Sequence, residues 1–285
     1  EHGDLLDLIA LNRGLDFRAA LDEARSFLSL PVPMIRQARP PAPSDSSEAA
    51  RRLFAASKPI HGTLAETWLR SRGILLPSDI SALCFHPRCF YRAPSGRQEW
   101  PALIAAVTDG KGNVTGVHRT WLDPSGGKAP VDQPRRALGH LAGNGVRFGA
   151  VTDTMLAAEG LETALAIKMI MPEMPVIAAL SAAHLAALML PRALCRLYVA
   201  RDNDAAGRFA LEKLRSRAGE IDIRELVPRA EDFNADLLTL GPDRLRGWIG
   251  EKLAPDDSHF LIHDGRKAHD GPAIGSLKGV RTRQV

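Results

Sequence analysis

Short apolar runs alternate with segments of helical periodicity in the second half of the chain. In the helical segments, apolar residues recur every three or four positions, as they do on one face of a helix. Repeated alternation of strand and helix favours a parallel sheet covered by helices, which is the α/β class. The apolar runs expected to form strands are residues 154–158, 176–180, 195–201 and 221–227.

The residues before this region have a different pattern, which predicts a smaller α+β subdomain. Two helical segments come first, and in the second of them Thr63 and Glu66 have the spacing of a capping box. An apolar hairpin with a Gly-rich turn follows. Trp68 is expected in the core. The predicted helices are residues 48–57 and 62–74, and the predicted hairpin strands are residues 102–107 and 114–122.

The two ends of the chain differ in composition from its middle. Helical segments at 3–14 and 16–28, the second capped by Asp16, precede a stretch rich in Pro, Ala and Ser that predicts a linker. Helical periodicity returns at 237–253, and the polar, basic residues beyond it are expected to be loosely ordered. The expected domains are residues 1–30, a linker at 31–47, the α+β subdomain at 48–150, the α/β domain at 151–253 and a tail at 254–285.

Acidic residues follow two of the predicted strands directly. Glu159 comes after the first strand, and Asp202 and Asp204 come after the third. Ligands of open α/β sheets bind beyond the carboxyl ends of the strands, so these side chains are expected at a site. Neighbouring carboxylates repel one another, and a divalent cation such as Mg²⁺ is the natural counter-charge. The alternative is that each residue is only a helix N-cap or a solvated loop residue.

These two segments resemble the Toprim domain of bacterial-type DNA primases, type IA and type II topoisomerases and some nucleases. The sequence E-G-L-E-T-A-L-A begins at Glu159, and D-N-D-A-A-G begins at Asp202. The resemblance implies that Glu159, Asp202 and Asp204 are catalytic and hold metal. Residues 229–238 resemble the primase segment that carries a further metal-binding acid, for which Asp232 is the best match and Asp236 the second. Several primases have Asp where Thr163 stands, which leaves open whether Glu162 takes that role.

Basic residues gather on glycine-rich segments just after the hairpin. Arginine and lysine on such loops suit phosphate contacts, although a solvated polar loop is the alternative. The region resembles the amino-terminal part of the primase core, whose basic strip holds template and incoming nucleotide, and Arg119 and Lys128 fall in the matching hairpin and loop. The residues expected to bind nucleotide or DNA phosphates are Arg119, Lys128, Arg135, Arg136 and Arg201.

Composition and charge restrict the class of protein only mildly. Lys and Arg exceed Asp and Glu by 37 − 33 = 4, which is compatible with nucleic-acid binding. The three cysteines suggest a reducing compartment. Cys84, His86 and Cys89 lack a second pair of ligands nearby, so we interpret them as structural rather than as a zinc site. No apolar run is long enough to span a bilayer and no secretory signal opens the sequence, so a cytoplasmic protein without a membrane partner is expected.

The two helical segments near residue 1 resemble the tail of the zinc-ribbon module that precedes primase cores. The resemblance implies that the chain is a fragment cut downstream of such a module, and that Zn²⁺ would be bound only there. A match to primases of plasmids, phages or other mobile elements is a further expectation.

The sequence disfavours two of the Toprim chemistries. A topoisomerase needs a tyrosine nucleophile, and of the two tyrosines Tyr198 lies inside a predicted strand. Nucleases of the overcoming-lysogenization type usually carry an ATPase phosphate loop, and no G-x-x-x-x-G-K-[ST] run occurs.

The expected function is that of a DNA primase, which makes short RNA primers on single-stranded DNA by nucleotidyl transfer dependent on Mg²⁺ or Mn²⁺. Its partners would be the template, nucleoside triphosphates and a replicative helicase. The alternatives are a non-polymerising Toprim accessory protein that binds nucleic acid, or a Toprim nuclease.

Overall fold

The computed structural model describes residues 44–261 and, before them, residues 9, 11–16, 19–20 and 23–24. The chain divides into two units, residues 1–41 and 42–285. In the first unit, Asp16 Oδ1 accepts a hydrogen bond from Ala19 N at 2.8 Å, as expected of an N-cap. The rest of the predicted helices at 3–14 and 16–28, most of the linker and the tail beyond 261 lie outside the described residues.

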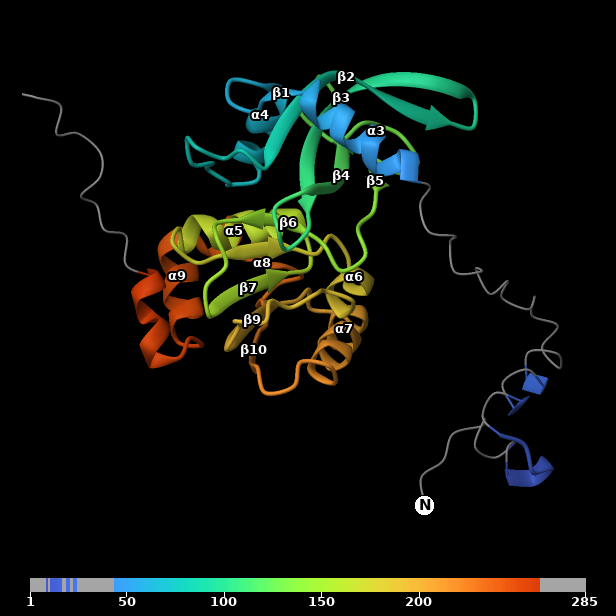
Figure 1. Ribbon diagram of the computed structural model, residues 1–285, viewed down its shortest axis with the longest axis vertical. Coiled ribbons are helices and arrows are strands. Elements are labelled where there is room, and N and C mark those ends of the chain that lie inside the picture. The colour runs from blue at the N-terminus through green and yellow to red at the C-terminus, as the bar shows by residue number, and fades with distance from the viewer. Residues whose placement is uncertain (1–8, 10, 17–18, 21–22, 25–43, 262–285) are drawn as a thin grey trace, which may run out of the picture. The chain divides into compact units, whose positions relative to one another are not determined.

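The first half of the second unit is built on an antiparallel sheet with strand order β1-β2-β3-β4-β5 (Figure 1). Helix α3 packs against β4 and β5. The predicted hairpin is confirmed, and its first strand is longer than expected because β3 also pairs with the long strand β2. The elements are α3 (Ser44–Ala55), β1 (Lys58–Pro59), α4 (Leu64–Ser71), β2 (Leu83–Ala93), β3 (Gly96–Thr108), β4 (Val114–Trp121) and β5 (Arg135–Gly139).

The second half contains a five-stranded sheet of order β10-β9-β7-β8-β6, flanked by helices (Figure 1). Its strands are parallel except β6, which runs antiparallel to β8. The predicted alternation of strand and helix is confirmed. The elements are β6 (Val146–Phe148), β7 (Thr154–Ala158), α5 (Leu161–Ile170), β8 (Val176–Ala178), α6 (Ala182–Ala186), β9 (Arg196–Ala200), α7 (Ala205–Arg215), β10 (Asp222–Leu226), α8 (Phe233–Leu240), α9 (Pro242–Gly250) and the 3-10 helix η1 (Pro255–Leu261).

One hydrophobic core joins the two sheets. Leu103 of β3 and Leu122 after β4 belong to the same buried cluster as Leu156 of β7 and Leu165 of α5. Trp68 of α4 is also part of it, which confirms its expected place in the core. The opposite face of the first sheet packs against α3 in a separate cluster. The two halves of this unit are therefore held together by apolar burial.

Three local predictions about helices were wrong. The helix expected from residue 48 begins at Ser44, inside the predicted linker. The Thr63 hydroxyl donates to Ile60 O instead of capping α4, and Glu66 accepts from Gly62 N at 2.7 Å. The helix predicted over 237–253 is broken at Gly241, whose φ of 75° suits glycine and separates α8 from α9.

The first residues of the predicted tail are ordered, contrary to expectation. Residues Pro255–Leu261 form η1, in which Asp257 and Phe260 are buried. Asp257 Oδ2 accepts hydrogen bonds from Tyr198 Oη at 2.5 Å and from Arg196 Nη1 at 2.9 Å. This helix could not be predicted from its polar composition, because it is held by contacts with β9. The partners of Asp257 there, Arg196 and Tyr198, lie 61 and 59 residues earlier in the chain. Among the described residues, no helix is long and apolar enough to cross a membrane.

Candidate metal centre

Glu159 and Asp202 follow neighbouring parallel strands. In the register of β7 and β9, Ala158 lies opposite Ala200, and Glu159 N donates to Ala200 O at 3.1 Å. The two acidic side chains are therefore brought to the same edge of the sheet. Glu159 Oε2 lies 3.5 Å from Asp202 N.

The carboxylate of Asp202 is the most perturbed group at this edge. Burial raises its pKa to about 7, helped by repulsion from Glu159 and then Asp232, Asp204 and Glu162. Its Oδ1 atom is buried and has no hydrogen-bond partner among the described residues. Burial also raises the pKa of Glu159, although backbone N–H groups of Asp202 and Ala182 partly oppose this. The Asp202 carboxylate is thus repelled by its neighbours, and no basic side chain among the described residues forms an ion pair with it.

Asp204 and Asp232 cap helices. Asp204 Oδ1 accepts from Gly207 N at 2.7 Å at the start of α7, and Asp232 Oδ1 accepts from Ala235 N at 2.7 Å at the start of α8. The N-cap considered from the sequence is thus present at Asp204, and the cap at Asp232 was not expected. Each remains close enough to repel the Asp202 carboxylate. A cap occupies one carboxylate oxygen, and the negative charge of each residue still raises the pKa of Asp202.

Gly207 explains the glycine of the D-N-D-A-A-G motif. A Cβ atom at this position would lie 2.6 Å from Asp202 O and 3.2 Å from Glu159 Oε2. The first turn of α7 therefore sits directly against both acidic residues, and a side chain would displace them.

Asp236 and Glu162 are fully engaged within the protein. Both carboxylate oxygens of buried Asp236 accept backbone hydrogen bonds, from Arg229 N at 2.7 Å and Ala230 N at 2.8 Å. Glu162 is buried and forms an ion pair with Arg135 of β5. Asp236 therefore shapes the loop before α8, and Glu162 links the acidic edge to the first sheet.

The residues at this edge suit a hard divalent cation. Across the described segments, no three His, Cys, Asp or Glu side chains are arranged to hold one ion. Mg²⁺ commonly takes only one or two carboxylates and fills its other positions with water and substrate phosphate. The unpartnered Oδ1 of Asp202, with Glu159 beside it, meets that requirement.

Four of the five predicted basic residues form two groups. Lys128 and Arg135 lie near the acidic edge: burial lowers the pKa of Lys128, as does repulsion from Arg135, while Glu162 and Asp232 oppose the shift. Arg119 and Arg136 are a cross-strand pair of β4 and β5. Arg119 and Trp121 alternate with Thr120 along β4, so they point to the face that packs against α3.

Arg201 is committed to the sheet. It is 6% exposed, its Nε donates to Glu225 Oε1 at 2.6 Å and its Nη1 donates to Asp202 O at 3.0 Å. It therefore links β9 to β10 and supports the backbone of the Asp202 loop.

Sequence reasoning missed the turn between β8 and α6. Leu180 has a φ of 78°, an uncommon conformation for a residue other than glycine. The turn presents the N–H of Ala182 to Glu159, and Ser181 caps α6 by accepting from His184 N at 3.2 Å. The apolar run 176–180 contains no signal for this conformation, although Ser181 is a suitable N-cap.

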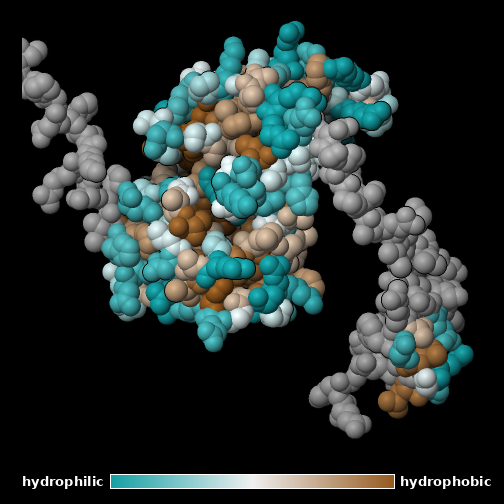
Figure 2. Space-filling model, viewed as in Figure 1, coloured by the Kyte–Doolittle hydropathy of each residue, from teal (hydrophilic) through white to brown (hydrophobic). Residues whose placement is uncertain are grey.

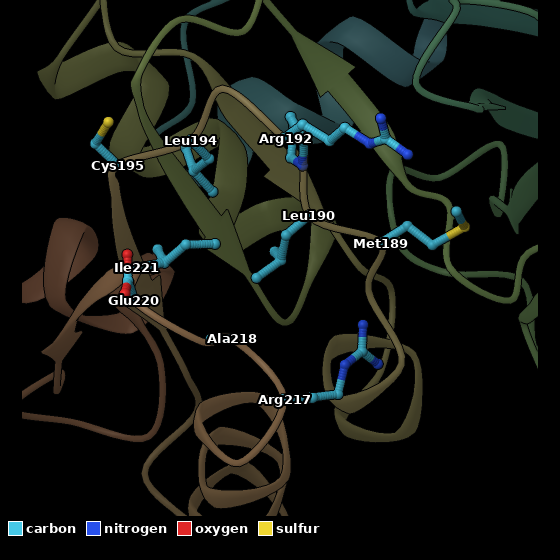
Figure 3. A pocket seen from close by; sticks show the side chains of 10 residues that line it. Met189, Leu190, Arg192, Leu194, Cys195, Arg217, Ala218, Glu220 and Ile221 are labelled. Carbon is cyan, nitrogen blue, oxygen red and sulfur yellow. The ribbon is translucent and has the colours of Figure 1, made fainter.

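A separate cavity of 660 Å³ lies at the opposite ends of the same strands (Figure 3). Cys195 before β9 and Ile221 before β10 line it. Arg217 donates to the carbonyls of Ala186 and Leu188 there. None of the residues of the acidic edge contributes to this cavity.

Two parts of the chain match known families. Residues 44–148 match a family described as a domain of unknown function (DUF7146), and residues 154–243 match the Toprim domain. A comparison with curated proteins finds no match.

Solved primase structures share the fold at low identity. The zinc-binding and RNA polymerase domains of the Aquifex aeolicus primase are 15% identical, with a TM-score of 0.50 over 88% of this chain and 71% of that one. A DNA primase domain from Pseudomonas aeruginosa is 16% identical, with a TM-score of 0.51 over 75% and 81%. The E. coli primase catalytic core is 16% identical, with a TM-score of 0.51 over 75% and 82%. Residues 154–243 therefore form a Toprim domain, which follows an antiparallel sheet as in primase catalytic cores.

Proposed function

We propose that this chain is the polymerising core of a DNA primase, which makes short RNA primers on single-stranded DNA. The observation that carries the proposal is the unpartnered Asp202 carboxylate beside Glu159, at the carboxyl edge of a Toprim sheet. A pair of hard oxygen ligands suits a divalent cation that supports nucleotidyl transfer.

Each acidic residue has a defined part in this proposal. Glu159 and Asp202 would hold Mg²⁺ or Mn²⁺, and Asp204 and Asp232 would add negative charge that favours binding of the cation. A bound divalent cation neutralises phosphate charge and orients the groups that react. Asp202 must first lose its proton, and its pKa of about 7 places that step near neutral pH.

The basic residues supply the opposite charge. Lys128 and Arg135, beside the acidic edge, would bind the phosphates of the incoming nucleoside triphosphate. Arg119 and Arg136, on the other face of the first sheet, would bind phosphates of the DNA strand. Arg201 would act on the site through the backbone of Asp202.

The same proposal includes the compartment, the partners and the replicon of the protein. The protein would work in the cytoplasm with a single-stranded template, nucleoside triphosphates and a replicative helicase. Zn²⁺ would belong to a module upstream of residue 1, and the host replicon would be a mobile element, plasmid or phage.

The test is primer synthesis from labelled ribonucleotides on a single-stranded template, with Mg²⁺ and with Mn²⁺. We expect product from the wild type and from Asp243→Asn, a change at an exposed carboxylate of α9, and none from Asp202→Asn. Equal product from Asp202→Asn would contradict the proposal.

A second candidate is a Toprim protein that binds nucleic acid without polymerising. It is favoured by the caps at Asp204 and Asp232, each of which commits one carboxylate oxygen to a helix N-terminus. A wild type that binds the template but makes no product would support it. Cleavage of the template in the same assay would instead identify a nuclease.

A further inference from the structure

His118 of β4 points towards the second half of its unit. Figure 2 shows hydrophilic side chains around the end of the β2–β3 hairpin, and His118 does not belong to that surface. It alternates along β4 with Val117 and Arg119, which point to the α3 face, so its own side chain points to the opposite face. Leu122, four residues later on that same face, belongs to the core that joins the two sheets. His118 therefore faces the Toprim domain.

A neighbouring arginine connects His118 to the acidic edge. In the register of β4 and β5, His118 lies opposite Ala137, so Arg135 is its diagonal neighbour on the same face. Arg135 forms the ion pair with Glu162 at the acidic edge. Together with Lys128, Arg135 is proposed above to bind the phosphates of the incoming nucleoside triphosphate. His118 is thus adjacent to the proposed nucleotide site.

A second histidine approaches His118 from the Toprim domain. His184 of α6 lies close enough to His118 to contribute to lowering its pKa. His184 follows the turn in which the N–H of Ala182 donates a hydrogen bond to Glu159. The two histidines, one from each half of the unit, are therefore neighbours of the residues proposed to bind the cation and the nucleotide.

Both histidines have a nitrogen atom without a partner. The Nδ1 atoms of His118 and His184 are buried, and neither has a hydrogen-bond partner among the described residues. Buried polar atoms of folded proteins are nearly always hydrogen-bonded. A buried nitrogen that lacks a partner, next to a proposed substrate site, is available to a ligand.

The surroundings of His118 keep it uncharged at neutral pH. Burial lowers its pKa to about 3, with further repulsion from Arg135, Arg119 and His184. A neutral imidazole has one nitrogen that donates a hydrogen bond and one that accepts. It therefore suits a hydroxyl group, which also donates and accepts. Phosphate oxygens are better bound by the cationic side chains of Lys128 and Arg135. In a nucleoside triphosphate, the ribose hydroxyls adjoin the phosphates.

We propose that His118 is a specificity-determining residue, which hydrogen-bonds the 2′-hydroxyl of the incoming nucleotide and so favours ribonucleotides over deoxyribonucleotides. This role rests on the proposed function, which places a nucleoside triphosphate at the acidic edge. A site built to bond a substrate hydroxyl rejects an analogue without it, because its polar groups are then left unpaired. His118 contacts the sugar and takes no part in bond formation or cleavage.

The test compares binding of ATP and of 2′-deoxyATP to the full chain by isothermal titration calorimetry, with Mg²⁺ and without template. We expect the wild type to bind ATP at least about tenfold more tightly than 2′-deoxyATP. His118→Phe keeps a flat ring and removes both nitrogens, so it should weaken ATP binding alone and abolish the preference. A preference that is absent from the wild type, or unchanged in this variant, would overturn the proposal.

A second variant separates the polar atom from the shape of the ring. His118→Asn retains a donor and an acceptor close to the ring position of Nδ1, so it should keep a preference for ATP. Loss of the preference equal to that in His118→Phe would overturn the proposal. Thermal unfolding checks that each variant is folded, and His118→Leu replaces His118→Phe if the latter does not unfold cooperatively.

The matched control is His86→Phe. His86 is a half-buried histidine of the same sheet, and its Nδ1 already accepts a hydrogen bond from Arg88 N at 3.2 Å. We expect this variant to keep the wild-type preference for ATP. A loss as large as that in His118→Phe would overturn the proposal, because it would show that the effect is not specific to position 118.

Two further outcomes distinguish the related possibilities. Equal weakening of ATP and 2′-deoxyATP binding in His118→Phe would assign the residue to the phosphates or the base and overturn the proposal. Absence of primer synthesis by the wild type would contradict the proposed function. In that case, a preference for ATP that depends on His118 in the binding assay would still support the role of this residue.

Discussion

Glu159 Oε2 lies 3.5 Å from the backbone nitrogen of Asp202, a residue 43 positions later in the chain. The contact places one carboxylate against the loop that carries another, with Gly207 packed on both. No cationic side chain lies in this contact, and Arg201 nearby is committed to Glu225. This arrangement fits the divalent cation of the proposed function.

Asp202→Asn should abolish activity and stabilise the apo protein. Loss of a ligand should lower primer synthesis by at least about 100-fold, since even groups that only orient ligands contribute 10- to 100-fold. Removal of the repelled carboxylate should raise the free energy of unfolding by about 1 kcal/mol after allowance for screening. Urea denaturation in EDTA measures this change, and a destabilised variant would contradict it.

Stability of the apo protein should fall as pH rises from about 4 to about 7. In this window the folded state keeps a proton on Asp202, whose pKa is about 7, while the unfolded chain has released it near 3.8. The stabilisation that the bound proton gives the folded state is complete when the pH is below the pKa of Asp202 in the unfolded chain. It is lost as the pH rises through the pKa of Asp202 in the folded protein. Urea denaturation in EDTA at several pH values checks this, and Asp202→Asn should flatten the dependence.

Mg²⁺ should bind more tightly as pH rises through the same range. Because Asp202 must be deprotonated to bind a cation, the apparent affinity should fall about tenfold per pH unit below about 7. Isothermal titration calorimetry in the absence of nucleotide measures this. An affinity independent of pH would mean that Asp202 does not hold the ion.

Serine at position 204 or 232 should keep the N-cap hydrogen bond of the helix and remove the negative charge of the aspartate. Serine is nearly as good an N-cap as aspartate, so Asp204→Ser and Asp232→Ser should keep the free energy of unfolding within about 0.5 kcal/mol. Each should weaken Mg²⁺ binding by about tenfold because a carboxylate near Asp202 is removed. Calorimetry measures the Mg²⁺ affinity of each variant, and urea denaturation measures its free energy of unfolding. An unchanged Mg²⁺ affinity would mean that both residues act only as helix caps.

Gly207→Ala should damage the site, whereas Gly247→Ala should not. A Cβ at 207 would meet Asp202 O at 2.6 Å, so we expect a loss of about 1–3 kcal/mol of stability and at least about tenfold lower activity. Gly247, inside α9, has nothing within 4 Å of such an atom, and alanine there should stabilise by about 0.5–1 kcal/mol. Thermal unfolding and primer synthesis of both variants provide the comparison.

The sheet and its acidic edge could be predicted because both depend on local patterns. Apolar runs specify strands, and the residue after each run lies at the carboxyl edge whatever the strand order. Glu159 and Asp202 were therefore expected together before their distance was known. The order β10-β9-β7-β8-β6 could not be read in this way, because it depends on pairings between distant segments.

The sequence could not predict which basic residues lie near the acidic edge, because this depends on the face of the first sheet to which each side chain points. Arg135 and Arg136 are neighbours in sequence, yet one pairs with Glu162 and the other with Tyr91. A strand turns successive side chains to opposite faces, and the start of β5 was not visible in the sequence pattern. The pairing of Arg119 with Arg136 could not be predicted either, because it depends on the register of β4 and β5.

Helix η1 sets a practical limit on how short an expressed version of this protein can be. A polypeptide that stops at residue 253, the predicted domain end, would lack the carboxylate of Asp257 that accepts from the Tyr198 hydroxyl and from Arg196. Tyr198 is fully buried in β9, the strand that leads into Asp202, so its hydroxyl would lose an acceptor inside the protein. Recombinant versions intended for crystallisation or enzymology should therefore extend at least to Leu261.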